Sequence, residues 1–219
     1  MRIVLGAGTP ANTVPDPTGV RKVRSWYAIC RGEDRIQKFG IMKTDNTKTD
    51  GQWSSTQPEF HRFFVDQLKD IYWAEKHLKK GLRKMSKAAT SAKLTAAFEK
   101  HYNEGDKQIA ELETIFGLMG EKPEAKRCEA MAGLLEEAEG MISDTQKNSF
   151  VRDAGLILAA QKVEHYEIAT YGTLSALAAY LPEKKVKKML ETILHGEKKT
   201  DEALTKLAEE FVNECAAVE

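Results

Sequence analysis

From Pro58 onward, apolar residues recur at spacings of three and four, which is the period of an amphipathic helix. Pro58, Pro123 and Pro182 fall where this pattern starts or breaks, and proline commonly begins or ends helices. No stretch alternates apolar and polar residues for long enough to predict a β-strand. The sequence therefore predicts an all-α domain over residues 58–215.

The breaks in the pattern divide this domain into helices of unequal length. The connections after the first helix and before the last are only a few residues long, so the helices that they join run antiparallel. The middle connection is long enough to cross the bundle, and it contains a short helix of its own. This order predicts a ferritin-like four-helix bundle with a short extra helix in the long middle connection. We expect the helices at residues 58–89, 91–118, 127–143, 150–180 and 183–213.

Residues 1–57 have a different composition from the domain that follows. They are more basic than the rest of the chain, and residues 43–57 contain Trp53 as their one large apolar side chain. We interpret 1–57 as a poorly ordered N-terminal extension, because it offers too little apolar surface to offset the entropy lost on ordering. Met42 offers an alternative start of translation, which would leave residues 1–41 as upstream sequence.

Charge and cysteine usage exclude several classes of protein. Lysine plus arginine equal aspartate plus glutamate, 33 against 33, so net charge predicts neither a nucleic-acid partner nor a membrane partner. No apolar run reaches the roughly 20 residues that cross a bilayer. The three cysteines are odd in number and lack CxxC spacing, which favours free thiols and a cytoplasmic location.

The apolar run from Ala154 to Leu181 places four of its ionisable side chains within six consecutive positions, at Lys162, Glu164, His165 and Glu167. Charges that only make a helix soluble spread along its outer face instead. Each of the other long helices also interrupts its apolar stripe near mid-length with a carboxylate or an imidazole. These interruptions are Glu75 in the first helix, His101 and Glu104 in the second, and Glu197 in the last.

The interrupting glutamates fall at similar depths in the bundle. Glu75 lies roughly 21 Å before the first turn and Glu104 roughly 18 Å after it, at the rise of an α-helix. Glu164 lies roughly 27 Å before the last turn and Glu197 roughly 22 Å after it. Four carboxylates in one core layer cannot all stay ionised without compensation, since a lone buried charge costs several kcal/mol. Either they share protons with nearby histidines, or cations lie between them.

Several of these segments resemble one known family. The strings "LKDIYWAEKHL", "FEKHYNEGDKQIAELE", "CEAMAGLLEEAEG", "AAQKVEHYEIATYGTL" and "GEKKTDEALTKLA" are similar to the YciF/YciE family of bacterial ferritin-like stress proteins, which is related to rubrerythrin. The resemblance extends from about Phe60 to Ala208. It implies a dimeric, cytoplasmic four-helix domain that is induced under stress and binds metal, without an assigned reaction.

The di-iron relatives of this family provide a pattern for the site. In them, two helices each contribute one glutamate and two helices each contribute Glu-x-x-His. Glu75 and Glu164 match the lone glutamates, and Glu104 and Glu197 match the start of Glu-x-x-His. The histidine expected three residues later is absent from both helices.

Two further residues can compensate for the missing histidines. His101, three residues before Glu104, can supply a nitrogen from the same face in reversed order, and Glu167 can supply oxygens one turn from Glu164. Such a carboxylate-rich set favours iron(II) or manganese, here expected as a binuclear site. Tyr72, one turn before Glu75, is the tyrosine that we expect to donate to a ligating carboxylate. The expected metal ligands are Glu75, His101, Glu104, Glu164, Glu167 and Glu197.

Three functions remain open from the sequence. The first is a metal-dependent redox protein that consumes peroxide or oxidises iron under stress. The second is a structural or partner-binding bundle that retains vestigial carboxylates. The third, capture of a ligand in an apolar groove, is disfavoured by the clustering of the carboxylates. No catalytic residue is assigned. A homodimer is expected, because the helix at residues 150–180 is apolar nearly all round and such helices are buried on every side.

Overall fold

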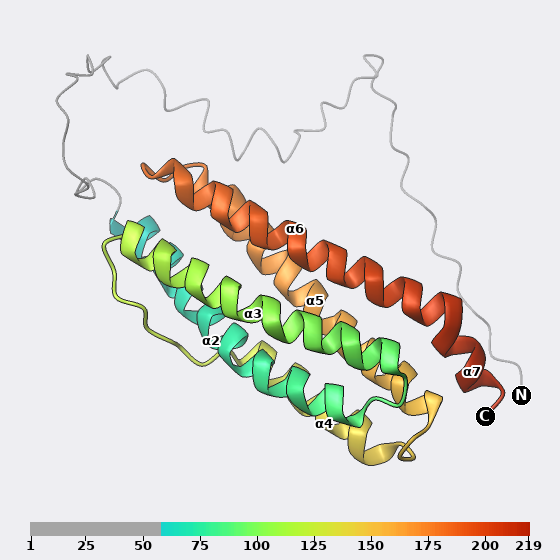
Figure 1. The fold of residues 1–219 in the computed structure, drawn as a ribbon. Coiled ribbons are helices and arrows are strands. Elements are labelled where there is room, and N and C mark those ends of the chain that lie inside the picture. Colours follow the sequence, from blue (N-terminus) through green and yellow to red (C-terminus); the bar gives the residue numbers. More distant parts are fainter. Residues whose placement is uncertain (1–57) are drawn as a thin grey trace, which may run out of the picture. The chain divides into compact units, whose positions relative to one another are not determined.

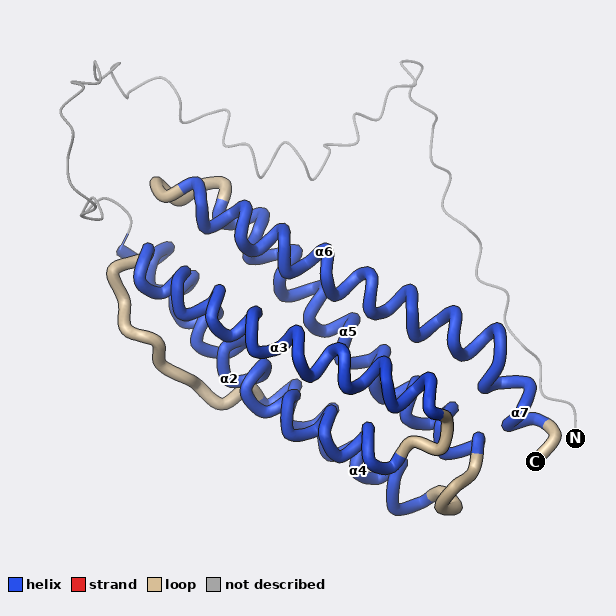
Figure 2. Tube along the Cα trace, in the orientation of Figure 1, coloured by secondary structure: helices blue, strands red, loops and turns tan. Residues whose placement is uncertain are grey.

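The computed structural model of the protein describes residues 58–219, and the expectations for 1–57, including a start at Met42, concern residues outside this range. Every regular element of the described part is a helix, and it contains no strand (Figure 2). The prediction of an all-α domain is confirmed.

The helix boundaries agree with the predicted ones to within a few residues, except at the C-terminal end. There the single helix predicted to reach residue 213 is interrupted by a π-helical turn. Val212 in this turn is fully buried, and the ring of Phe211 packs edge-on against Phe150 with centroids 5.4 Å apart. The elements are α2 (Pro58–Ala88), α3 (Ala92–Leu118), α4 (Glu129–Asp144), α5 (Phe150–Ala178), α6 (Lys184–Leu207), η2 (Ala208–Val212) and α7 (Asn213–Ala217).

The long helices form two antiparallel hairpins, α2 with α3 and α5 with α6, and these pack into one bundle (Figure 1). Helix α3 lies against α6, and α2 lies against α5. The connection after α3 runs back beside α2, where the backbone N–H of Lys126 donates to the carbonyl of Lys69 at 3.1 Å. The short helix α4 then packs on both α2 and α5. The fold is therefore the expected ferritin-like four-helix bundle with an extra helix in its middle connection.

Local hydrogen bonds end helix α3 and start the long connection. Gly120 adopts a φ of 74°, the left-handed conformation that glycine tolerates best. This allows the N–H of Glu121 to reach back to the carbonyl of Phe116 at 2.9 Å, and that of Gly120 to reach Gly117 at 3.1 Å. The pair of bonds is a Schellman motif, which satisfies carbonyls that the helix end leaves free.

A buried aspartate joins the two hairpins at the other end of the bundle. Asp153 on α5 is fully buried, and its carboxylate accepts hydrogen bonds from the backbone N–H groups of Thr90 and Ser91, both at 2.7 Å. The neighbouring Arg152 side chain donates to the carbonyls of Ile142 at 2.9 Å and Thr145 at 2.5 Å. These bonds attach the start of α5 to the α2–α3 turn and to the end of α4. They therefore fix the position of α5 along the bundle axis relative to α2 and α3.

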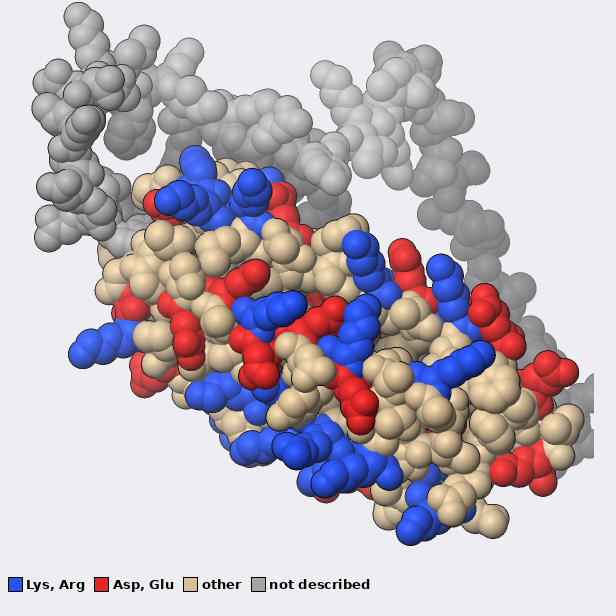
Figure 3. Space-filling model, viewed as in Figure 1, with Lys and Arg blue, Asp and Glu red and all other residues tan. Residues whose placement is uncertain are grey.

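The core of the bundle is apolar along most of its length, and the surface is charged. Leucine, isoleucine and phenylalanine dominate the fully buried side chains. On the visible face, lysine and arginine are interspersed with aspartate and glutamate (Figure 3). Within residues 58–219, no helix is long and apolar enough to cross a membrane. The departures from this arrangement are the buried polar side chains near the middle of the bundle.

Candidate metal centre

Four glutamates and one histidine are buried at mid-length between the helices. Glu75 comes from α2, Glu164 and Glu167 come from α5, and Glu197 comes from α6, and each is at most 1% exposed. His101 of α3 is 3% exposed. Each of these residues continues the apolar stripe of its helix, so the helical period itself carries it into the core. Three of the four glutamates predicted to share one core layer, Glu75, Glu164 and Glu197, are therefore buried, together with Glu167, which was expected one turn from Glu164.

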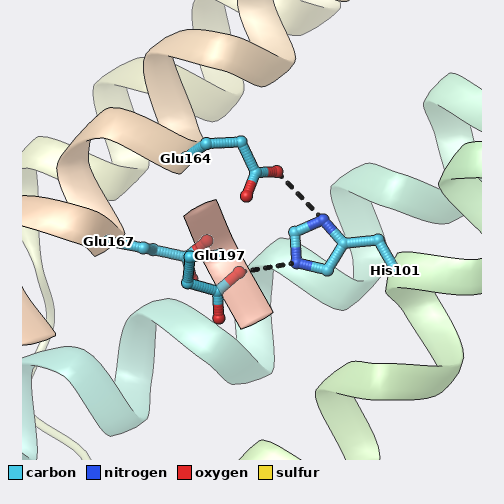
Figure 4. A group of neighbouring side chains, drawn as sticks. All are labelled: His101, Glu164, Glu167 and Glu197. Carbon is cyan, nitrogen blue, oxygen red and sulfur yellow. Dashed lines mark ion pairs between the residues drawn. The ribbon is translucent and has the colours of Figure 1, made fainter. Parts of the chain in front are cut away.

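The imidazole of His101 lies between two of the carboxylates (Figure 4). Its Nδ1 is 3.0 Å from Oε1 of Glu164, which is hydrogen-bonding distance. Its Nε2 is 3.5 Å from Oε2 of Glu197, which is too long for a good hydrogen bond. The imidazole of His101, when protonated, thus partly neutralises the negative charge of two buried carboxylates, one from α5 and one from α6.

Most of the remaining ligand atoms have no hydrogen-bond partner. Among residues 58–219, the buried side-chain atoms without a partner include both oxygens of Glu167, Oε2 of Glu164 and Nε2 of His101. Buried polar atoms in proteins are almost always paired, and an unpaired buried carboxylate is especially costly. One ligand atom from each of the four residues His101, Glu164, Glu167 and Glu197 lies within 4.8 Å of all the others. This group has the composition and the compactness of a cation-binding site.

Glu75 lies beside this four-residue group and has a partner of its own. The hydroxyl of Tyr171, fully buried on α5, donates to Oε1 of Glu75 at 2.5 Å. Burial raises the pKa of Glu75 to about 7, although this hydrogen bond and the charge of His101 act in the opposite direction. Glu75 therefore contributes negative charge to the site, while one of its oxygens already accepts the hydrogen bond from Tyr171.

Burial and mutual repulsion dominate the protonation of the group. Burial raises the pKa of Glu167 and of Glu197 well above the ordinary range, and the charges of the neighbouring glutamates raise both further. Burial by itself lowers the pKa of His101, but the adjacent carboxylates of Glu164 and Glu197 outweigh it and raise the pKa to about 9. Near neutral pH the group therefore retains protons that a bound cation could replace.

The expectation that Glu104 joins the site is wrong. Its side chain is 40% exposed, and its carboxylate lies 3.7 Å from Nζ of Lys100 on the surface of α3. Gln108 takes the inward position instead: it is buried, and its amide nitrogen donates to Oε1 of Glu197. At about 100° per residue, Gln108 lies within about 20° of His101 around the helix axis, whereas Glu104 lies about 60° away.

The tyrosine expected to hydrogen-bond a ligating carboxylate was also misidentified. Tyr72 donates to Glu113 on α3 at 2.7 Å, away from the buried group. Tyr171 makes the expected contact, and it lies seven positions after Glu164 on the same face of α5. The signal for Gln108 and Tyr171 was a polar atom on an otherwise apolar stripe. His165 lies outside the site, with a side chain that is 71% exposed and 3.5 Å from Asp201.

Known proteins are similar to this chain in sequence and in fold. A family described as a domain of unknown function (DUF892) matches residues 59–217. Protein YciF of Escherichia coli strain K12 is 46% identical over 154 residues, which cover 70% of this chain and 92% of YciF. The crystal structure of that stress protein matches with a TM-score of 0.68 at 44% identity, over 71% of this chain and 98% of YciF.

A second solved structure has the same fold. YcfI from Rhodopseudomonas palustris, provisionally described as a structural protein, matches with a TM-score of 0.65 at 36% identity. The match covers 70% of this chain and 98% of YcfI. The family model covers most of the chain, and the relatives are covered nearly completely. This chain therefore belongs to the DUF892 family and is a relative of the E. coli stress protein YciF.

Proposed function

We propose that this protein binds divalent iron or manganese in the buried group of His101, Glu164, Glu167 and Glu197, and that it acts in the response to stress. The observation that carries the proposal is Glu167, a fully buried carboxylate with no hydrogen-bond partner for either oxygen. A hard divalent cation would compensate this charge and that of its neighbours. The stress-protein relative YciF supports the physiological part of the proposal.

The chemistry of the ligand atoms favours some metals over others. Carboxylates with a single imidazole suit iron(II) and manganese, whereas copper and structural zinc sites prefer more nitrogen or sulfur. Among residues 58–219 the cysteines are Cys128 and Cys215, and neither belongs to the group. When bound, iron would supply redox chemistry towards oxygen or peroxide. The protein's own contribution is to hold the ligands, to exclude water from them, and to release protons as the cation binds.

A non-enzymatic structural role is the alternative. It is favoured by the description of the relative from R. palustris and by the contacts that His101 makes with Glu164 and Glu197 without any metal. In that case the glutamates form a proton-sharing network that is part of the core. The two functions predict different results for one substitution.

Glu167→Gln separates them, because it removes a charge with little change in volume and disturbs no contact of His101. If the site binds metal, iron and manganese content after purification should fall sharply. The free energy of unfolding of the metal-free protein should hold or rise, since a repulsive buried charge has been removed. Glu104→Gln, the same change on the surface of α3, is the matched control and should alter neither quantity.

In a structural network, the wild type itself would contain only background metal. Glu167→Gln would then lower the free energy of unfolding by about 1–3 kcal/mol if the new amide goes unpaired. Metal analysis by plasma mass spectrometry and urea unfolding with chelator measure the two quantities. Background metal in the wild type, even after growth with added iron and manganese, would exclude the proposed function.

A further inference from the structure

We infer that the buried group binds a single divalent ion, and that Tyr171 keeps Glu75 from becoming a ligand. The inference rests on the proposed metal-binding function and departs from the binuclear site that the sequence led us to expect. Three observations support it: the short distances between the ligand atoms, the lack of a buried carboxylate on α3 beside the group, and the hydrogen bond between Tyr171 and Glu75.

The size of the group matches the ligands of one ion. Its four ligand atoms all lie within 4.8 Å of one another. Ligands about 2.1 Å from a small divalent ion lie at most about 4.2 Å apart across it, so modest closure would complete one such set. Two ions of a binuclear site lie about 3.5–4 Å apart, which separates their outermost ligands by roughly 8 Å. The nearest ligand atoms of the four residues therefore suit one ion, and a second ion would need further ligands beside them.

The α3 side of the group lacks the carboxylate that a second ion needs. Glu104 faces solvent beside Lys100. Gln108 occupies the inward position and directs its amide nitrogen at Glu197. An amide N–H donates a hydrogen bond and cannot ligate a cation, and the amide oxygen of Gln108, which is buried without a hydrogen-bond partner among residues 58–219, is neutral and does not replace the charge of a carboxylate. Helix α3 thus contributes an imidazole, His101, and an amide that orients Glu197, but no carboxylate.

Glu75 is the only other buried carboxylate next to the group in the described part of the chain, and Tyr171 holds it. The phenol donates to Oε1 of Glu75 at 2.5 Å, and both side chains are buried. If Glu75 turned towards a metal, the hydroxyl of Tyr171 would lose its acceptor, and an unpaired buried hydroxyl is destabilising. Tyr171 is therefore a positioning residue that favours Glu75 as a neighbouring charge over Glu75 as a ligand.

The test is a titration of chelator-treated full-length protein with Mn²⁺, with equilibrium dialysis for stoichiometry and electron paramagnetic resonance for coupling between ions. The wild type should saturate at about one Mn²⁺ per chain and give the signal of an isolated ion. Glu75→Gln should keep that stoichiometry, with a Kd within about fivefold of the wild type. Glu167→Gln should weaken binding by about a hundredfold or more, because it removes a ligand.

Tyr171→Phe examines the positioning role directly. It frees Glu75 at the edge of the group, so the Kd for Mn²⁺ should fall by about tenfold or a second equivalent should appear. A merely structural tyrosine would leave stoichiometry, affinity and spectrum unchanged, and that result would contradict the role given to Tyr171. Thermal unfolding of each metal-free variant shows that the compared proteins are folded.

Other outcomes separate this inference from the proposed function. Two Mn²⁺ per wild-type chain with a coupled signal, or loss of binding in Glu75→Gln, would overturn the single-ion inference and leave metal binding intact. Absence of Mn²⁺ binding by the wild type, together with absence of Fe²⁺ binding under anaerobic conditions, would overturn the proposed function itself.

Discussion

Helix α5 has an inner face and an outer face, and each carries side chains expected of the other. The inner face buries Glu164, Glu167 and Tyr171 in the bundle. The outer face exposes Val151 and Leu158, which are 49% and 50% exposed. Leu158 also lines a groove of about 760 Å³ between α4 and α5. The helix therefore buries charge and exposes apolar surface.

The inner face has uncompensated negative charge and the outer face has uncovered apolar surface, so the two faces favour different kinds of partner. Buried carboxylates need compensating positive charge, which His101 supplies only in part. Exposed apolar side chains cost little individually, but a helix face that exposes Val151 and Leu158 together favours a covering surface. We propose that a cation completes the inner face and that a second copy of the chain covers the outer face as a homodimer. The exposure of Val151 and Leu158 on the outer face supports the dimer.

The largest effect is expected from removing the imidazole of the inner face. His101→Leu leaves the carboxylates of Glu164 and Glu197 without their positive partner. Breaking a buried ion pair in this way costs about 3–5 kcal/mol. For a domain of this size the melting temperature of the metal-free protein should fall by roughly 10 °C. Circular dichroism at pH 8 measures it, and His195→Leu on the exposed face of α6 is the matched control. Equal melting temperatures in both variants would mean that His101 does not compensate the carboxylates.

The pH dependence of stability should reverse when metal binds. The pKa of His101 rises from 6.5 in the unfolded chain to about 9, and that of Glu75 rises from 4.5 to about 7. A raised native pKa stabilises the fold fully below the unfolded pKa, and this contribution is lost as pH increases through the native pKa. The free energy of unfolding of the metal-free protein should therefore fall between pH 5 and pH 9, by about 3 kcal/mol if one proton is involved.

Metal binding requires deprotonated ligands, so the Mn²⁺-loaded protein should instead gain stability over the same range of pH. Urea unfolding at several pH values, with chelator and with Mn²⁺, compares the two trends. Parallel trends in both conditions would show that the inner face does not exchange its protons for a cation.

A smaller effect is expected on the outer face. Leu158→Arg places a charge in the centre of the proposed dimer contact and should weaken association by about 2 kcal/mol, or roughly thirtyfold in Kd. The folding of the single chain should change little, because Leu158 is half exposed. Multi-angle light scattering gives the mass at several concentrations, and Val218→Arg near the exposed C-terminus is the control. A wild type that is monomeric at micromolar concentration would refute the dimer.

The smallest effect is expected from shortening the chain. Variants that begin at Met42 or at Pro58 should keep the melting temperature within a few degrees, because the regular apolar period begins only after Pro58. They should also keep metal content and dimer mass, since both faces of α5 belong to the bundle. A large fall in melting temperature would show that residues 1–57 contribute to the stability of the bundle.

Much of this arrangement was determined by the sequence alone. Apolar spacing and proline positions predicted the long helices to within a few residues over most of their length. They also predicted that Glu75, Glu104, Glu164 and Glu197 would share one core layer near His101, with Glu167 one turn from Glu164, and all of these except Glu104 are buried. These features depend on local properties, because the helical period determines which residues share a face and the constant rise determines their depth.

Only the tertiary structure decided the details of the site. A helix packs through a stripe about 100° wide, and a residue 60° from its centre, such as Glu104, is covered or exposed depending on how the neighbouring helix crosses. The helical period of α3 favours Gln108 over Glu104 for the inward position, but only the packing of the bundle shows that Glu104 is left exposed. The hydrogen bond between Tyr171 and Glu75 joins α5 to α2, and their proximity depends on the packing of the two hairpins. For the same reason, an apolar helix such as α5 does not by itself reveal which of its faces is inside.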